Sequence, residues 1–107
     1  MGKSLNKEKI LEILRKEHSY LYEKYGIEKM AIYGSFAKNH PKRKSDVDIL
    51  VKLKKPLGLK FVGLAYYLED KLGREVDLAT FKTFQRSMKD PRYKAIAANI
   101  EKTLTYV

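Results

Sequence analysis

Apolar side chains recur every three or four residues in the first part of the chain, which is typical of a helix with one buried face. The residues that share this face are Ile10, Leu11, Leu14, His18, Leu21 and Tyr25. Asn6 can cap the start of such a helix, and Gly26 can end it. The sequence therefore predicts an amphipathic helix between these two residues, in which His18 packs or is partly exposed rather than catalytic.

Three short segments have the apolar composition and alternation of β-strands. They are residues 27–33, 46–53 and 74–81. Gly34 ends the first strand, and residues 35–38 predict a turn of helix after it. A polar segment, residues 39–44, then leads to the second strand. It could steer a triphosphate or meet an acidic partner, and a plain solvated loop is the alternative.

Helical spacing returns after the second strand and again near the end of the chain. One helix carries Phe61, Leu64, Ala65, Leu68 and Leu72 and ends at Gly73, and the other carries Ile96, Ile100 and Leu104. The final residues predict a short strand or an extended tail. This order of elements is typical of an α/β (α+β) fold with a small mixed β-sheet flanked by helices, and we expect residues 1–107 to form one domain.

The charge balance favours a negatively charged partner. With 23 Lys and Arg against 13 Asp and Glu, the net charge is +10. Such a chain attracts nucleic acid, nucleotide phosphates or an acidic protein, and the charge alone does not choose among them. No apolar run could span a membrane and no signal peptide is visible, so we expect a soluble, cytoplasmic protein.

Two carboxylates share one face of the second strand. Alternation places Asp46 and Asp48 opposite Val47 and Ile49. Side chains two positions apart on a strand lie about 6.6–6.8 Å apart at Cα, so both carboxylates can converge on one cation or on a close pair of cations. Such hard oxygen ligands suit Mg²⁺, whose coordination is usually completed by substrate phosphates.

A third carboxylate, Asp77, points away from the apolar residues of the third strand. On a neighbouring strand it would let two ions sit roughly 3.5–4 Å apart, as in enzymes that carry out in-line displacement at phosphorus. It could also accept the proton of an attacking hydroxyl. For each of these acidic residues taken alone, a solvated strand face is the alternative interpretation.

Gly34 and Ser35 stand where the first strand gives way to a helical turn. Glycine lets the backbone approach a ligand closely, and free N–H groups at the start of a helix favour an anion such as a nucleotide phosphate. The Ser35 hydroxyl adds one more donor. The sequence therefore predicts that this turn holds a triphosphate while the aspartates hold its metal.

The order and spacing of Gly34, Ser35, Asp46, Asp48 and Asp77 resemble the nucleotidyltransferase superfamily that includes DNA polymerase β. The likeness is greatest to its minimal members, the MNT proteins, and runs from the first helix to the last. It implies a nucleotidyltransferase fold and Mg²⁺-dependent transfer of a nucleoside monophosphate to a hydroxyl, with release of pyrophosphate. ATP is the donor that the resemblance implies, with the three aspartates as ligands of two Mg²⁺ ions.

One position departs from the pattern of these minimal members. Many of them have Arg after the G-S-x-A motif, whereas this chain has Lys38. The positive charge is kept, but a planar two-point contact with phosphate is lost. A role for Lys38 in phosphate binding is therefore a weaker expectation than the roles of Gly34 and Ser35.

The resemblance also implies a partner. MNT proteins are commonly paired with a HEPN-domain protein in toxin–antitoxin modules, in which the MNT protein is the antitoxin. In characterised pairs it transfers AMP from ATP to a tyrosine of the HEPN ribonuclease. We expect the same activity here, and neutralisation of the toxin by binding alone is the alternative.

A function from another class is a basic module that binds nucleic acid directly. It would draw on the lysines and arginine of residues 42–44 and the lysines of residues 52–55. Three aspartates placed to repel phosphate disfavour it. Transfer to a small molecule is disfavoured because no second domain is present to hold the acceptor, and His40 has no second His at a spacing that suits zinc.

Overall fold

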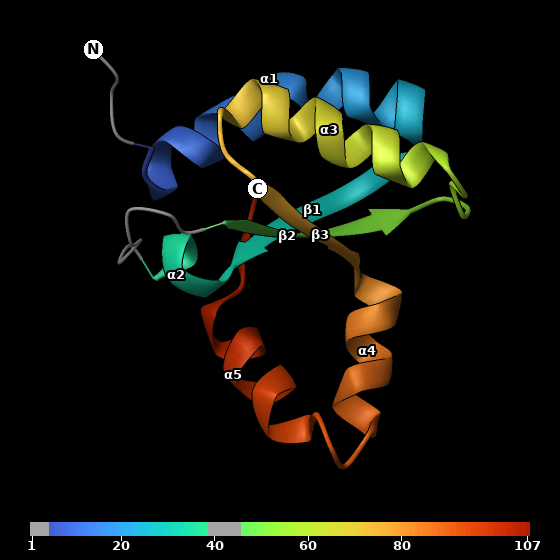
Figure 1. Ribbon diagram of the computed structural model, residues 1–107. Coiled ribbons are helices and arrows are strands. Elements are labelled where there is room, and N and C mark those ends of the chain that lie inside the picture. The colour runs from blue at the N-terminus through green and yellow to red at the C-terminus, as the bar shows by residue number, and fades with distance from the viewer. Residues whose placement is uncertain (1–4, 39–45) are drawn as a thin grey trace.

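The computed structural model describes residues 5–38 and 46–107. In chain order its elements are α1 (Lys7–Tyr25), β1 (Ile27–Tyr33), α2 (Gly34–Ala37), β2 (Val47–Leu53), α3 (Lys60–Leu72), β3 (Val76–Thr80), α4 (Phe81–Lys89), α5 (Lys94–Thr103) and β4 (Thr105–Tyr106). The strands form one sheet in the order β3-β2-β1-β4 (Figure 1). β2 and β3 are parallel, whereas β1 is antiparallel to both β2 and β4, so the expected mixed sheet is confirmed.

The first helix begins and ends where its sequence predicts. The Asn6 side chain accepts a hydrogen bond from the backbone N–H of Lys9 at 2.8 Å, which satisfies one of the donors left free by the first turn. Gly26 ends the helix in the left-handed conformation with φ of 70°. The apolar face of α1 is buried except at His18, which is exposed.

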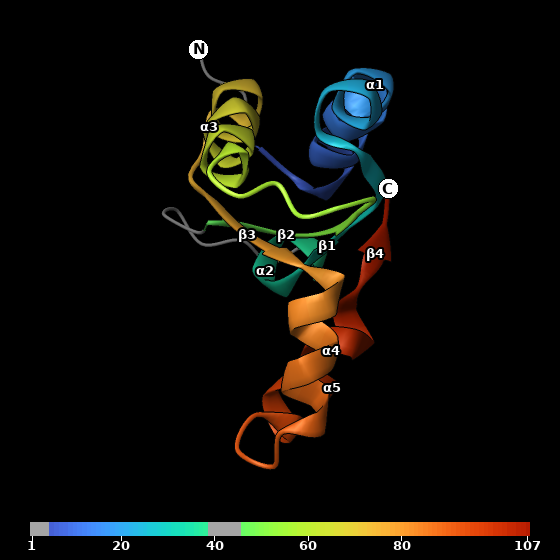
Figure 2. The ribbon, with the colours of Figure 1, turned by 90° about the vertical axis from the view of Figure 1, so that its right-hand side faces the viewer.

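Two layers of helices cover the sheet, one on each face (Figure 2). α1 and α3 lie on the face that carries Val47, Ile49 and Val51, and together they enclose the main core. The α4 and α5 helices form a hairpin on the opposite face. There Leu50 and Phe84 are buried with Ala97 in a smaller core.

A helix that was not expected from the sequence follows the third strand. Strand β3 ends at Thr80, and Phe81 starts α4 instead of continuing the strand. The Thr80 hydroxyl accepts a hydrogen bond from the backbone N–H of Thr83 at 3.1 Å and so caps the helix. Phe84 is buried, and Phe81 and Met88 pack against the same smaller core, so the apolar residues of α4 recur at helical spacing.

The last helix has a buried face that differs from the expected one. Ile100 and Leu104 pack against the smaller core as predicted. Ile96 is 60% exposed, and Ala97 takes the buried position instead. The reason is that α5 packs closely on α4, where a small side chain fits the contact.

Two expectations fall outside the described residues: the position of His40 and the basic segment at residues 42–44. Within residues 5–38 and 46–107, no helix combines the length and apolar character needed to cross a membrane.

Candidate functional site

Asp48 and Asp77 are direct neighbours on adjacent parallel strands, because their Cα atoms are partners in the pairing of β2 with β3. Both side chains point to the sheet face that carries the α4 and α5 helices, since the alternate residues Val47, Ile49 and Leu78 belong to the opposite core. Asp46 immediately precedes β2, where it is exposed. The register between the strands thus sets Asp48 beside Asp77 on one face of the sheet, with Asp46 just before the start of β2.

The turn at Gly34 lies directly against Asp48. A side chain at position 34 would overlap the Oδ2 atom of Asp48, with its Cβ only 3.2 Å from Cγ. Gly34 has φ of 76°, a left-handed backbone that favours glycine. The structure therefore brings the Gly-Ser turn and the carboxylates together, although the segment that joins them in the sequence is outside the described residues.

Crowding of negative charge perturbs the proton affinity of the site. Burial, then the charge of Asp77, then that of Asp46 raise the pKa of Asp48 to about 6. Tyr33, the partner of Asp48 in the pairing of β1 with β2, responds to the same charges. Burial, followed by Asp77 and Asp48, raises the pKa of the Tyr33 phenol to about 12. The sheet thus concentrates negative charge in a protein whose net charge is +10.

The carboxylates alone do not supply a complete set of metal ligands. Across residues 5–38 and 46–107, no three His, Cys, Asp or Glu side chains are gathered so that they could hold a metal ion. Mg²⁺ is commonly bound through one or two carboxylates together with substrate phosphates and water. The aspartates offer hard oxygen ligands, and their mutual repulsion is one of the causes that raise the pKa of Asp48. They therefore suit Mg²⁺ bound together with a substrate better than a permanently enclosed metal ion.

Ser35 and Lys38 lie at the two ends of the short α2 helix. Ser35 is partly buried in the turn, while Lys38 is exposed and ends the helix through its backbone N–H, which donates to the Gly34 carbonyl at 3.1 Å. No side chain caps the start of α2. The backbone N–H groups at the start of α2 therefore have no side-chain cap, and they lie close to the carboxylates. N–H groups of this kind can bind a phosphate.

Two residues at this site were missed from the sequence. Tyr33 contributes its phenol beside Asp48 and Asp77, and its place immediately before Gly34 could have indicated this. Thr103 reaches the turn from the end of α5, where its hydroxyl accepts a hydrogen bond from the Gly34 N–H at 3.5 Å. Nothing in the sequence connects positions 69 residues apart.

Comparison with known proteins gives consistent matches along the chain. Residues 7–104 match the nucleotidyltransferase domain family. A candidate protein adenylyltransferase of Methanocaldococcus jannaschii is 41% identical over 99 residues, which cover 92% of this chain and 94% of the relative. The protein adenylyltransferase MntA of Thermococcus cleftensis is 36% identical over 104 residues, which cover 96% of this chain and 97% of the relative.

Solved structures resemble the same architecture. A candidate minimal nucleotidyltransferase covers 97% of this chain and 98% of its own, with a TM-score of 0.69 and 23% identity, and so shares the fold. A toxin–antitoxin structure with AMP-PNP is 28% identical with a TM-score of 0.53. That match covers 73% of this chain and 59% of the other.

Proposed function

This chain belongs to the nucleotidyltransferase domain family, and on that premise we propose that it is a protein adenylyltransferase, which transfers AMP from ATP to a hydroxyl of another protein. The observation that carries the proposal is the meeting of Gly34, Asp48 and Asp77 at one point of the sheet. The relatives named as protein adenylyltransferases, which span nearly the whole chain, support this donor and this class of acceptor.

Asp46, Asp48 and Asp77 are the residues that would hold Mg²⁺, as two ions completed by the phosphates of ATP. When bound, the ions supply positive charge that offsets the charge developing on the phosphate oxygens. Burial raises the pKa of Asp48 most, and repulsion from Asp77 and Asp46 adds to it. A cation between the carboxylates would relieve that repulsion, which supports this assignment.

The turn at Gly34 and Ser35 would bind the triphosphate through backbone N–H groups and the Ser35 hydroxyl, with the Lys38 ammonium nearby in sequence. The acceptor oxygen attacks the α-phosphorus, and the bond from that phosphorus to the pyrophosphate oxygen breaks. Asp77 accepts the proton of the acceptor hydroxyl, and pyrophosphate leaves. Thr103 positions the turn through its hydrogen bond with the Gly34 N–H.

The proposed acceptor is a tyrosine of a HEPN-domain ribonuclease toxin, so that this protein acts in the cytoplasm as the antitoxin. The MntA relative and the toxin–antitoxin structure with AMP-PNP support a toxin partner and nucleotide use. The HEPN domain and the tyrosine rest on the resemblance to MNT proteins.

The test is transfer of label from ATP labelled at the α-phosphate, in the presence of Mg²⁺, to the protein encoded beside this one. Gel analysis and intact mass would follow the label. We expect an increment equal to AMP on the partner, and none with Asp46→Asn/Asp48→Asn. Asp70→Asn, which removes an exposed carboxylate on α3, is the matched control and should transfer normally.

Two outcomes would contradict the proposed transfer of AMP or the role of the aspartates in it. A folded protein that binds the partner but transfers no label would show that neutralisation occurs by binding alone. If the double variant still transferred label to the partner, Asp46 and Asp48 would not be needed for the reaction.

A further inference from the structure

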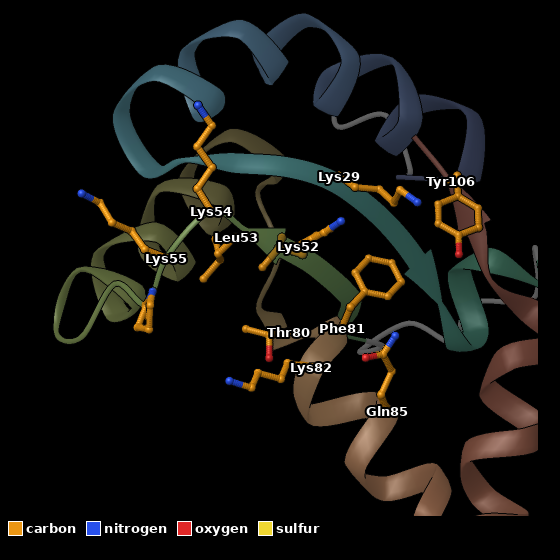
Figure 3. A pocket seen from close by; sticks show the side chains of 12 residues that line it. Lys29, Lys52, Leu53, Lys54, Lys55, Thr80, Phe81, Lys82, Gln85 and Tyr106 are labelled. Carbon is orange, nitrogen blue, oxygen red and sulfur yellow. The ribbon is translucent and has the colours of Figure 1, made fainter.

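A basic pocket lies on the same sheet face as the aspartates but at the other end of β2 (Figure 3). Its volume is about 610 Å³. Five lysines line it, contributed by β1, by β2 and the loop after it, and by the start of α4: Lys29, Lys52, Lys54, Lys55 and Lys82. Among the described residues that line the pocket, none is acidic. The pocket is therefore a concentrated positive site.

The lysines are not neutralised by neighbours. Within the described ranges, none of the five takes part in an ion pair with a carboxylate. Two of them contact aromatic rings: the Lys29 Nζ lies 5.2 Å from the ring centre of Tyr106, and the Lys54 Nζ lies 4.2 Å from that of Tyr22. Lys52, Lys55 and Lys82 are exposed. Their charges are available to an anion from solvent.

The pocket is separate from the aspartates. Lys52 and Asp48 are four positions apart on β2 and so share a face, with about 13 Å between their Cα atoms at the usual rise of a strand. Leu50 lies between them and is buried with Phe84 of α4. One face of the sheet thus carries negative charge at one end and positive charge at the other.

The lysines are spread out instead of converging on one point. In Figure 3 the Lys54 side chain points toward α1, the Lys55 side chain points outward from the loop, and Lys52 points toward Lys29. A single phosphate would need the ammonium groups to meet at one place. This arrangement suits a ligand that carries several phosphates along its length.

An aromatic pair stands beside the lysines. The rings of Phe81 and Tyr106 are parallel, with an interplanar angle of 1° and centres 6.0 Å apart. Tyr106 is 51% exposed. Gln85 and Thr80 add an amide and a hydroxyl to the same wall. Aromatic faces next to a positive groove are the two features by which proteins bind unpaired nucleotides.

We propose that this pocket binds single-stranded nucleic acid, with phosphates on Lys52, Lys55 and Lys82 and a base against the half-exposed ring of Tyr106. An acidic peptide would use the lysines but would have no base to stack on the ring. A duplex keeps its bases paired and could not offer one to the ring. The inference does not depend on the proposed transfer reaction.

The test measures binding of a short fluorescent RNA strand to the whole protein by anisotropy over a series of salt concentrations. Each lysine that contacts a phosphate of a single strand adds about 0.7 to the salt slope. We therefore expect Lys52→Gln/Lys82→Gln to weaken binding at least about tenfold and to lower the slope by about 1.4. Tyr106→Val should weaken binding without changing the slope.

The matched control is Lys16→Gln/Lys60→Gln, which removes the same charge from the helices on the opposite face. It should bind RNA almost as well as the unaltered protein. Equal losses in the two double variants would mean attraction to overall charge only, and would overturn the proposal. It would also be overturned if polyglutamate, free ATP or duplex RNA competed as well as the single strand, or if Tyr106→Val bound normally. Thermal unfolding of each variant confirms that it is folded.

Discussion

The carboxylate of Asp48 occupies the space that a side chain at position 34 would need. Strand β1 ends at this point and strand β2 has just begun, so the antiparallel pair places the turn of one strand beside the acidic residue of the other. A close approach of this kind leaves room only for glycine. The site therefore depends on the backbone at position 34 as much as on the aspartates.

Replacement of Gly34 tests this relationship. In Gly34→Ala the left-handed backbone alone costs about 1–2 kcal/mol of the free energy of unfolding, and overlap with Asp48 displaces the carboxylate as well. We expect lower stability and loss of transferase activity. Chemical denaturation and the AMP-transfer assay measure the two effects.

Gly73→Ala is the control for backbone strain. Gly73 has nearly the same conformation, with φ of 69°, but apart from its chain neighbours no atom of the described residues lies within 4 Å of a Cβ added there. It ends α3 and does not contact the carboxylates. We expect a similar loss of stability with normal transfer. If both variants lost activity equally, strain alone and not the contact with Asp48 would explain the effect.

The raised pKa of Asp48 predicts how the stability of the metal-free protein depends on pH. The pKa is about 6 in the folded protein, above the ordinary value of 3.8 for an aspartate, so the folded state binds this proton more tightly than the unfolded state. This group destabilises the protein above pH 6, and the penalty is relieved as pH falls from about 6 to 3.8. Because Asp48 is partly exposed, we expect an effect on the order of 1 kcal/mol.

Asp48→Asn isolates that contribution. In the presence of a chelator at neutral pH, the variant should be more stable than the unaltered protein, and the difference should shrink in mild acid. Urea denaturation at several pH values measures it. Asp70→Asn should show no such pattern, because Asp70 is exposed on α3. A difference independent of pH would contradict the assigned cause.

Mg²⁺ and ATP should together stabilise the folded state. At a ligand concentration about ten times the dissociation constant, the gain is about 1.4 kcal/mol, enough to raise the melting temperature by several degrees in a domain of this size. Asp46→Asn/Asp48→Asn should lose this shift, and without ligand it should melt at or above the temperature of the unaltered protein, because the penalty of the Asp48 charge is gone. A shift that survives in the double variant would place the metal elsewhere.

The smaller core predicts a contrast between two positions in the helical hairpin. Phe84→Ala removes a buried ring and should lower the free energy of unfolding by about 3 kcal/mol. Ile96→Ala changes a side chain that is 60% exposed, so its effect should stay within about 0.5 kcal/mol. Denaturant titration compares the two. A large effect at Ile96 would mean that this face of α5 is covered in solution.

Much of the site could be predicted because strands alternate strictly. Period two alone directs Asp48 and Asp77 away from their apolar neighbours, whereas Asp46 lies just before the start of β2. The register that pairs Asp48 with Asp77 could not be predicted, since it depends on how α3 returns the chain to the sheet. The contact of Thr103 with the turn at Gly34 likewise exists only after α5 has packed.

The sequence predicted a helix correctly where several buried residues recur at helical spacing. α1 has five buried residues and two clear caps, and its limits were predicted correctly. α4 begins directly after β3 with no loop between them, so Phe81 was assigned to the strand although Phe81, Phe84 and Met88 recur at helical spacing. The basic pocket was seen only in part, because residues 52–55 are adjacent in sequence whereas Lys29 and Lys82 join them through the fold.

The position of β4 beside β1 has a consequence for the order in which the protein is made. β1 pairs on one side with β2, which follows soon after it, but its other neighbour comprises residues 105–106. During synthesis the outer edge of β1 therefore stays unpaired until nearly all of the described chain has been translated. The hydrogen bond from the Gly34 N–H to Thr103 must form equally late. A nascent chain that already carries all three aspartates thus still lacks the contact that supports the turn at Gly34, until Thr103 has been added.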